Sequence, residues 1–261
     1  MKKFIAAALA ALAVFGMMTA HEKEARAFEI TTIKEVCGNV VSADALSKIT
    51  LKGQKESGGG YYTNIRIEIA DENGSPLTVI KPPVDGGYNP DVILCRFDDS
   101  SGVSQIFLSA DSGGSGGFGY YYVYSYQDKN LDVLFDFEKF GNENKFCGRF
   151  LDGYSAELRS ADGSENWRID LGGKPYEYKY MIWNGEGKLR RPTPLDVSGV
   201  NSVFPYYNGT DGKCWLEVNQ KVTGVAQAYS LGYVSSRLVM EDGAFRIFMR
   251  ALALYPDERN F

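Results

Sequence analysis

Histidine is almost absent from this sequence, which has one, His21, among 261 residues. That residue lies in an N-terminal segment that we expect to be removed, so the mature chain is expected to contain no histidine. Histidine is the general base most often used by enzymes with a serine or cysteine nucleophile. Its absence argues against those hydrolases and leaves carboxylate chemistry as the enzyme class that it does not weaken.

Long apolar runs are also scarce, and the most extended one lies at the start of the chain. Two lysines precede an alanine-rich apolar run over Phe4–Met18, and Ala25-Arg26-Ala27 then fits the small-x-small cleavage pattern. The run is shorter than the roughly 20 residues that a membrane-spanning helix needs. We therefore expect residues 1–27 to be a signal peptide and the mature chain to begin at Phe28.

Positive charge is in short supply as well, with 28 Lys and Arg against 33 Asp and Glu and a net charge of −5. Removing residues 1–27 takes away four basic and two acidic side chains, which leaves a net charge of −7. Without a basic stripe, nucleic acid and anionic lipid are poor partners. No segment of the mature chain is apolar for long enough to be a transmembrane helix. We expect an exported protein, periplasmic, cell-surface or extracellular, with residues 28–261 in a single domain.

Cysteine is rare too, with four in the chain: Cys37, Cys95, Cys147 and Cys214. An even number in an exported protein favours disulfides, and four cysteines allow three pairings. The wide spacing, without a Cys-x-x-Cys motif, argues against a zinc site or a thioredoxin-like motif. Their even distribution suggests bridges between neighbours, Cys37 with Cys95 and Cys147 with Cys214. Buried free thiols are the alternative.

Turn signals dominate what is present, because Asx-Gly pairs tolerate the positive φ that tight hairpin turns require. The pairs are Asn73-Gly74, Asp85-Gly86, Asp152-Gly153, Asp162-Gly163, Asn184-Gly185, Asn208-Gly209, Asp211-Gly212 and Asp242-Gly243. Between them, runs such as Ile65–Ile69 and Tyr176–Ile182 alternate in the way that predicts half-buried strands. The one stretch with helical character is short and lies around Val225–Leu231. The sequence therefore predicts an all-β fold.

The chain also divides into four segments of similar size, each with room for about four short strands. They run approximately over residues 28–86, 87–142, 143–197 and 198–256. The second is the clearest, with strands expected near Asp91–Cys95, Ser104–Ala110, Tyr120–Tyr126 and Leu131–Phe137. Four-stranded units in succession suggest a β-propeller-like fold of about four units, and a β-sandwich is the alternative.

Several stretches resemble bacterial exported proteins labelled VCBS or FG-GAP repeat-containing. They are Asn89–Leu94, Gln105–Gly117, Tyr122–Tyr126, Val133–Phe140 and Ser230–Val234. The resemblance covers about residues 60 to 250, in patches. It implies a β-propeller or a close relative, in a family whose members generally lack an assigned activity.

Repeats of that type usually carry an acidic loop that can hold calcium, and this chain departs from the pattern. The corresponding stretch, Arg96–Gly102, contains Asp98 and Asp99, but Arg96 brings a positive charge. Calcium prefers about six to eight oxygen ligands, often from several carboxylates. We therefore interpret the stretch as a tight turn and expect neither bound calcium nor another cofactor.

A glycine-rich stretch is the strongest candidate for a binding loop. Gly113–Gly117 formally matches the Gly-x-Ser-x-Gly motif of α/β-hydrolases, and Gly114–Gly119 matches the dinucleotide fingerprint, but both motifs need a helix to follow. Phe118–Tyr126 is instead aromatic and β-prone, so we interpret the stretch as a loop between strands with room for a ligand beside backbone amides. The candidate ligand-binding residues are Asp111, Ser112, Gly113, Gly114, Ser115, Gly116, Gly117 and Tyr120.

The function we expect is that of a non-catalytic module that binds an unknown protein or glycan partner through loops on one face. A carboxylate-dependent glycoside hydrolase on the same scaffold is the alternative, and it needs two carboxyl groups across a cleft. No spacing selects a pair among the available residues, which are Asp98, Asp99, Asp111, Asp136 and Glu138. A purely structural component of the cell envelope is the third hypothesis.

Overall fold

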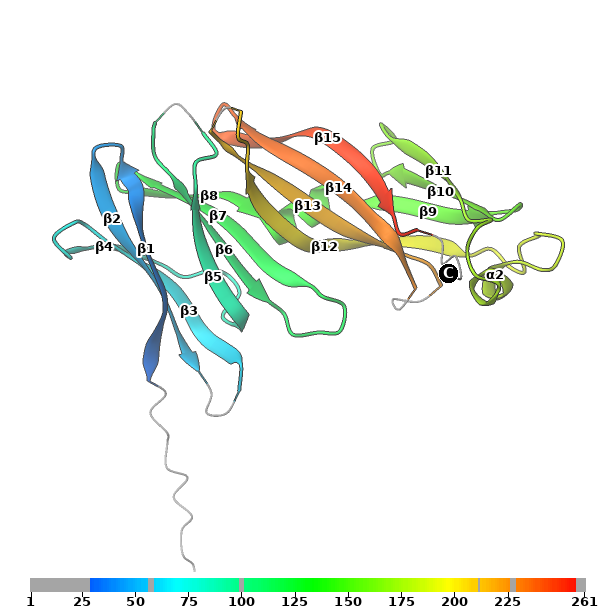
Figure 1. The fold of residues 1–261 in the computed structure, drawn as a ribbon, viewed down its shortest axis with the longest axis horizontal. Coiled ribbons are helices and arrows are strands. Elements are labelled where there is room, and N and C mark those ends of the chain that lie inside the picture. The colour runs from blue at the N-terminus through cyan, green and yellow to red at the C-terminus, as the bar shows by residue number, and fades with distance from the viewer. Residues whose placement is uncertain (1–28, 56–58, 99–100, 211, 226–228, 257–261) are drawn as a thin grey trace, which may run out of the picture.

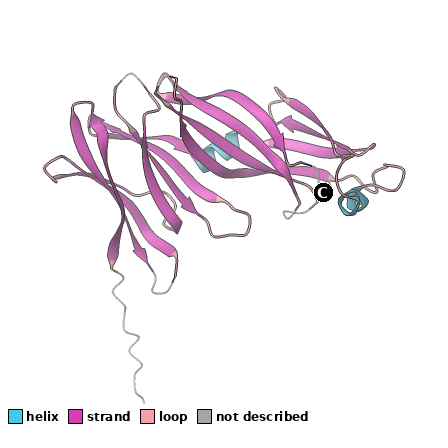
Figure 2. Cartoon of the chain, in the orientation of Figure 1, coloured by secondary structure: helices cyan, strands magenta, loops and turns pink. Residues whose placement is uncertain are grey.

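The computed structural model describes residues 29–55, 59–98, 101–210, 212–225 and 229–256, and the expected signal peptide lies outside them. The described residues form fifteen strands and two short helices (Figure 2), which confirms the all-β fold. The strands make two antiparallel sheets that lie next to each other along the longest axis of the molecule (Figure 1).

The first sheet comes from the N-terminal half of the chain. Its strands are β1 (Ile30–Ser42), β2 (Ala45–Lys55), β3 (Tyr61–Ala70), β4 (Pro76–Ile80), β5 (Gly87–Cys95), β6 (Gln105–Asp111), β7 (Gly119–Gln127) and β8 (Asn130–Asp136). The order is β1-β2-β3-β5-β6-β7-β8, and β4 pairs with β3 beside that path. Because β1 also contacts β5 and β7, the sheet curls until it is nearly a closed barrel.

The second sheet comes from the C-terminal half. Its strands are β9 (Phe146–Leu151), β10 (Ser155–Ser160), β11 (Asn166–Asp170), β12 (Pro194–Tyr207), β13 (Cys214–Thr223), β14 (Ser230–Glu241) and β15 (Ala244–Leu254), in the order β11-β10-β9-β12-β13-β14-β15. Helix α1 (Phe137–Glu143) connects the two sheets, and α2 (Tyr176–Ile182) lies between β11 and β12. No helix in the described part of the chain is long and apolar enough to cross a bilayer.

A shared core joins the two sheets, because strands β6 and β7 are buried on both faces. Tyr122 and Tyr124 point into the curled first sheet, whereas Tyr121 and Val123 pack against the second sheet, where Leu216 belongs to the same cluster. Burying a side chain of this size contributes roughly 1.5–3 kcal/mol. The alternating tyrosines of β7 therefore fill two cores at once.

A separate core lies at the far end of the second sheet, under α2. Tyr178 and Ile182 of that helix pack there with Trp183, which is 1% exposed. The Trp183 indole N–H donates to the Leu151 carbonyl at 2.7 Å, so its polar atom is satisfied inside the core. The helix thus contributes to the same buried cluster as residues of the short strands β9 to β11.

The four expected segments correspond to groups of consecutive strands, but these groups do not form blades. The first contains β1–β4 and the second β5–β8, and the two join into one sheet through a two-residue ladder between β3 and β5. A similar ladder between β9 and β12 joins the remaining strands. A propeller keeps each blade as a separate sheet, so the propeller-like arrangement is not supported. The two sheets are compatible with the β-sandwich alternative.

Most of the expected strands are present, with one exception. The four strands of the second segment are β5 to β8, and Ile65–Ile69 lies in β3. The strand expected over Tyr176–Ile182 is wrong, because those residues form α2, with Tyr178 and Ile182 buried on one face. The stretch Val225–Leu231 lies partly outside the described residues, and its last two residues begin β14.

Candidate functional site

A cleft of about 570 Å³ opens where the two sheets meet. Its walls come from the β6–β7 loop, α1, the start of β9 and the neighbouring strands β12 and β13. The lining residues are Phe118, Phe137, Glu138, Gly141, Asn142, Lys145, Phe146, Val197, Ser198, Gly199, Val200 and Gln220. A cleft of this size with both apolar and polar lining groups is a candidate small-ligand site.

Three phenylalanine rings form the apolar wall. The Phe137 ring stands edge-on to the ring of Tyr122, with 5.7 Å between centroids, and the Phe146 ring packs on Trp167 at 6.0 Å. Aromatic pairs of this kind contribute about 0.5–1.5 kcal/mol beyond their buried area. These contacts fix two of the rings, whereas the third, Phe118, is carried by the glycine-rich loop.

A bulge in β12 shapes another side of the cleft. The pairing of β12 with β13 shifts register between Val197 and Val200, so Ser198 and Gly199 leave the regular ladder and line the cleft. The Ser198 hydroxyl oxygen accepts the backbone N–H of Lys221 at 3.1 Å, which holds the bulge against β13. Bulges often redirect side chains beside functional sites.

Gln220 of β13 lines the same cleft and is 1% exposed. Its Nε2 donates to the carbonyl oxygens of Asn144 at 3.0 Å and Ser198 at 3.3 Å. Because both partners are acceptors, they fix which end of the side chain is the nitrogen. Among the described residues Oε1 has no hydrogen-bond partner, and a buried acceptor without one costs about 1–3 kcal/mol. Because Oε1 is buried as well, Gln220 does not reach a ligand in the cleft, and it instead holds the bulge of β12 and the residue after α1 in place beneath it.

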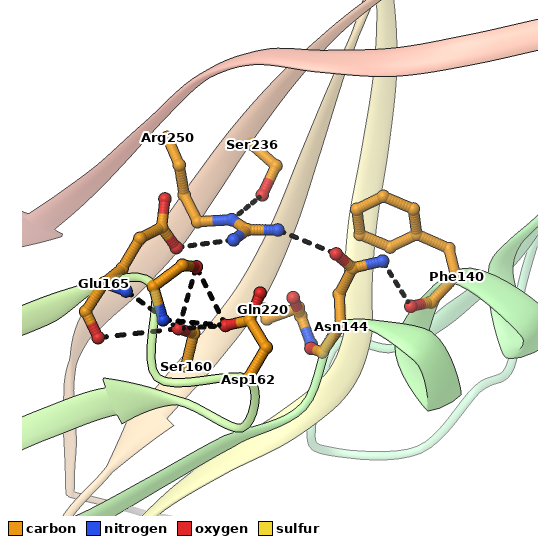
Figure 3. A network of polar contacts seen from close by, with 9 residues as sticks. Phe140, Asn144, Ser160, Asp162, Glu165, Gln220, Ser236 and Arg250 are labelled. Carbon is orange, nitrogen blue, oxygen red and sulfur yellow. Dashed lines mark hydrogen bonds and ion pairs between the residues drawn. The ribbon is translucent and has the colours of Figure 1, made fainter.

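A polar network behind the cleft holds these groups in place (Figure 3). Arg250 of β15 donates from Nη1 to Glu165 at 2.5 Å, from Nη2 to the side-chain oxygen of Asn144 at 2.7 Å and from Nε to Ser236 at 3.0 Å. The Arg250 side chain is 9% exposed, so these partners offset the cost of burying its charge. Asn144 in turn donates to the Phe140 carbonyl at 3.0 Å and ties the network to the end of α1.

Helix α1 forms one wall of the cleft, and the sequence specifies where it starts. The Asp136 carboxylate accepts the backbone N–H groups of Glu138 at 2.8 Å and Lys139 at 3.0 Å, which makes it an N-cap. Gly141 lets the helix approach β12 closely, because a Cβ atom there would lie 3.3 Å from a backbone nitrogen of that strand. Glu138 and Lys145 are exposed and place opposite charges on the lining of the cleft.

The glycine-rich stretch is the loop between β6 and β7, at the edge of the cleft. The Ser112 N–H donates to the Phe118 carbonyl at 2.9 Å, and the Asn201 side chain donates to the carbonyls of Gly116 and Gly117 at 3.1 and 3.2 Å. Gly117 has a φ of 68°, which favours glycine. Asn201 belongs to β12 and is 4% exposed, so the loop is fixed to the second sheet.

The predicted ligand-binding residues are not among those that line the cleft, and their neighbour Phe118 is the loop residue that does. Gly116 lies beneath the Phe118 ring, since a Cβ atom there would fall 2.5 Å from that ring. Tyr120 packs behind the cleft wall, 5.7 Å from the Phe137 ring. Asp111 accepts a hydrogen bond from Asn89 at 2.9 Å. Ser112 closes the base of the loop, while Gly113, Gly114 and Ser115 are exposed at its tip.

The carboxylates considered for catalysis do not gather in the cleft. Glu138 is the one that lines it among the described residues, and Asp99 lies outside them. Asp136 is engaged as the helix cap, and Asp98 follows the end of β5. Within the described ranges, no three His, Cys, Asp or Glu side chains are grouped so that they could hold a metal ion.

The four cysteines are free thiols in the structure. Cys37 in β1 and Cys147 in β9 are exposed, whereas Cys95 and Cys214 are buried with their thiols hydrogen-bonded to each other. The structure therefore brings Cys95 to Cys214 and not to Cys37, in contrast to the pairing of neighbours that their spacing suggested. The reason is that the end of β5 and the start of β13 meet in the core that the two sheets share.

Sequence reasoning did not single out Gln220, although a signal for it exists. The inward-facing positions of β13 include Leu216, Val218 and Val222, and Gln220 takes the remaining place in that apolar register. A polar residue at an inward position of a strand indicates a buried polar contact. No such pattern identifies the Arg250–Asn144 contact, because it joins residues 106 apart in the sequence.

Two other hollows in the described residues are less suited to a ligand. One of about 260 Å³ lies beside Cys147 on the outside of β9 and β10, and its charged lining residues include Arg149 and Arg159. The other, of about 420 Å³, lies beside Tyr178 and Tyr229. Its walls adjoin residues that the structure does not describe. The cleft between the sheets is larger than either and is enclosed by described residues.

Comparison with known proteins finds similarity to YybI. A family model described as the YybI C-terminal domain matches residues 144–253, which correspond to the second sheet. The uncharacterised protein YybI of Bacillus subtilis strain 168 is 28% identical over 223 residues, which cover 85% of this chain and 84% of that protein. No solved structure matches the chain.

These findings correct the resemblance to VCBS and FG-GAP repeat proteins, because no such repeat family is found. The stretches that carried the resemblance are strands β5 to β8, their glycine-rich loop and the start of β14. Tyrosine-rich strands and glycine-rich turns recur in many antiparallel sheets, since the physical demands of hairpins are general. The chain is similar instead to YybI, and its second sheet to the C-terminal domain described for that protein.

Proposed function

We propose that this protein is an exported, non-catalytic binding protein that holds a short, neutral glycan in the cleft between its two sheets. The observation that carries the proposal is one cleft that combines three phenylalanine rings with the exposed polar side chains of Glu138, Asn142 and Lys145. A sugar ring presents apolar C–H faces and a rim of hydroxyl groups. It can therefore stack on the rings while its hydroxyl groups bond to the side-chain amide of Asn142.

The size and charge of the cleft favour a glycan over a protein ligand. A volume of about 570 Å³ lies within the roughly 300–1,000 Å³ typical of small-ligand sites, and it is too small to admit a folded domain. The charges of Glu138 and Lys145 offset each other on its lining. A neutral, hydroxyl-rich ligand suits such a lining better than a strongly charged one.

Binding without hydrolysis is favoured by the carboxylates. Glycoside hydrolysis requires a pair of carboxyl groups about 5–10 Å apart on either side of the bond to be cleaved. Glu138 is the one carboxylate among the described lining residues. Export is supported by the N-terminal sequence pattern and by the acidic mature chain.

The test is calorimetric titration of the mature protein with neutral cello-, malto- and chito-oligosaccharides. We expect at least one series to bind and the Phe118→Ala variant to bind it about tenfold more weakly, a change of about 1.4 kcal/mol. Phe118 is half-buried and lies in a loop, so the substitution is not expected to unfold the protein. Ser115→Ala, at the exposed tip of the same loop, is the matched control and should bind as the wild type does.

Two results would contradict the proposal. One is that no oligosaccharide in the panel binds. The other is that a binding oligosaccharide is held equally well by the wild type and the Phe118→Ala variant, which would locate its site away from the cleft.

A further inference from the structure

Cys95 and Cys214 come from different sheets and meet in the core that joins them. Cys95 is the last residue of β5 and Cys214 the first of β13. They are 7% and 6% exposed and belong to the same buried cluster. Figure 1 shows the loop after β5 beside the turn between β12 and β13, at the junction of the sheets.

The backbone holds the two residues together independently of their side chains. The Cys214 N–H donates to the Arg96 carbonyl at 2.7 Å, directly after Cys95 in the chain. The Arg96 guanidinium donates to the carbonyl oxygen of Gly212 at 3.5 Å, and Gly212 lies two residues before Cys214 in the chain. The two thiols themselves are in hydrogen-bonding contact.

We propose that Cys95 and Cys214 form a disulfide that links the two sheets of the exported protein covalently. Disulfides require Cα atoms within about 7 Å and side chains that point toward each other. This pair is brought together by one backbone hydrogen bond, by the Arg96 side chain and by the contact between the thiols. Cys37 of β1 and Cys147 of β9 are exposed single thiols and take no part in the bond.

The bond forms by exchange with a disulfide-bearing oxidant, such as oxidised glutathione or a thiol–disulfide oxidoreductase. One cysteine thiolate attacks a sulfur of the oxidant and releases one of its thiols, and the second cysteine then attacks the mixed disulfide and releases the other. The two cysteines lose two electrons and two protons, and the oxidant is reduced to two thiols. Exchange takes place while the pair is accessible, during folding or local opening.

The contact between the two thiols in the folded protein also shifts their pKa values in opposite directions. The hydrogen bond from the Cys95 thiol and the nearby Arg96 lower the pKa of Cys214. The hydrogen bond to Cys214 and burial raise the pKa of Cys95.

The experiment uses the mature chain and a Cys37→Ser/Cys147→Ser variant, in which an intramolecular disulfide can only join Cys95 to Cys214. Each protein is reduced, refolded with oxidised glutathione, denatured, treated with N-ethylmaleimide and mapped by mass spectrometry without reduction. We expect a linked peptide pair containing Cys95 and Cys214, and in the wild type a label or glutathione on the other two cysteines. Maleimide or glutathione on Cys95 and Cys214 after refolding would overturn the proposal.

A thermal measurement covers the case in which a variant lacking the bond fails to fold. Adding a reductant to the oxidised Cys37→Ser/Cys147→Ser variant should lower its unfolding midpoint by roughly 5–15 °C. The Cys95→Ser/Cys214→Ser variant, where it folds, should show no response to the reductant. An unchanged midpoint for the Cys37→Ser/Cys147→Ser variant contradicts the inference without reference to the second variant.

Discussion

At the scale of single residues, Asn144 and Gln220 fix the polar side of the cleft before any ligand arrives. The Asn144 side chain bonds to Arg250 at 2.7 Å and to Phe140 at 3.0 Å, and its carbonyl accepts from Gln220 at 3.0 Å. The side chains of Asn144 and Gln220 are therefore both held in one orientation by hydrogen bonds within the protein. A cleft wall that is ordered before binding saves the ordering cost that mobile side chains would incur on binding.

Asp162 should make the free energy of unfolding depend on pH in the acidic range. Its carboxylate accepts from the Ser160 hydroxyl at 2.6 Å and the Ser164 N–H at 3.1 Å, which lowers the pKa of Asp162 from 3.8 to about 2. A lowered native pKa contributes stability above about pH 4 that is lost as the pH falls toward 2. In urea titrations between pH 4 and 2, we expect the Asp162→Asn variant to lose less stability than the wild type.

Asp242→Asn is the control for that experiment, since Asp242 lies in another Asx-Gly turn, between β14 and β15, where Asn is equally tolerated. Its urea midpoint should fall with pH as that of the wild type does. Identical acid dependence in the Asp162→Asn variant and the wild type would show that the Asp162 hydrogen bonds do not contribute.

At the scale of elements, the sequence predicts the hairpins but does not predict the short helix α2. The loop from Asp111 to Phe118 is identified because glycines separate two β-prone runs. Over Tyr176–Ile182, Tyr178 and Ile182 lie four residues apart, so the run satisfies both the period of a strand and that of a helix. Pro175 directly before the helix favours a helical start, and this signal outweighs the alternation.

Helix α1 offers a test of how firmly the cleft wall is set. Removing the cap with Asp136→Ala should destabilise the protein by about 1 kcal/mol, because the N–H groups of Glu138 and Lys139 lose their acceptor. Urea unfolding measures the loss, and hydrogen exchange at these two amides should accelerate. Asp136→Asn keeps a capping oxygen and should stay within about 0.5 kcal/mol of the wild type. Equal losses in the two variants would contradict the capping role.

At the scale of the whole molecule, the sequence predicts strands better than it predicts how sheets join. The groups β1–β4 and β5–β8 match the expected segments, yet a two-residue ladder between β3 and β5 turns them into one sheet. A ladder of two residue pairs is too short to leave a periodic pattern in the sequence. The cleft depends on the same kind of long-range packing. The glycine-rich loop was therefore predictable, whereas the contact of Asn144 with Arg250, 106 residues away in the sequence, was not.

The shared core predicts that the two sheets unfold together, as the single domain expected from the sequence would. Leu216 is fully buried in that core, so Leu216→Ala should cost about 2–5 kcal/mol. Tryptophan fluorescence reports on the second half of the chain, since all three tryptophans lie there, whereas circular dichroism reports on both sheets. For the wild type and the variant, we expect the two unfolding curves to coincide. Separate transitions would show that the sheets are independent domains.

Ligand binding in the cleft between the sheets is the central claim, and nuclear magnetic resonance tests it most directly. A ¹⁵N-labelled mature protein is titrated with the cello-, malto- or chito-oligosaccharide that binds in calorimetry, and amide shifts are followed residue by residue. We expect the largest changes at the Gln220 side-chain amide and at the backbone amides of Phe118, Gly141 and Gly199, which line the cleft. Changes confined to another surface, or no changes at saturating sugar, would contradict the proposed function.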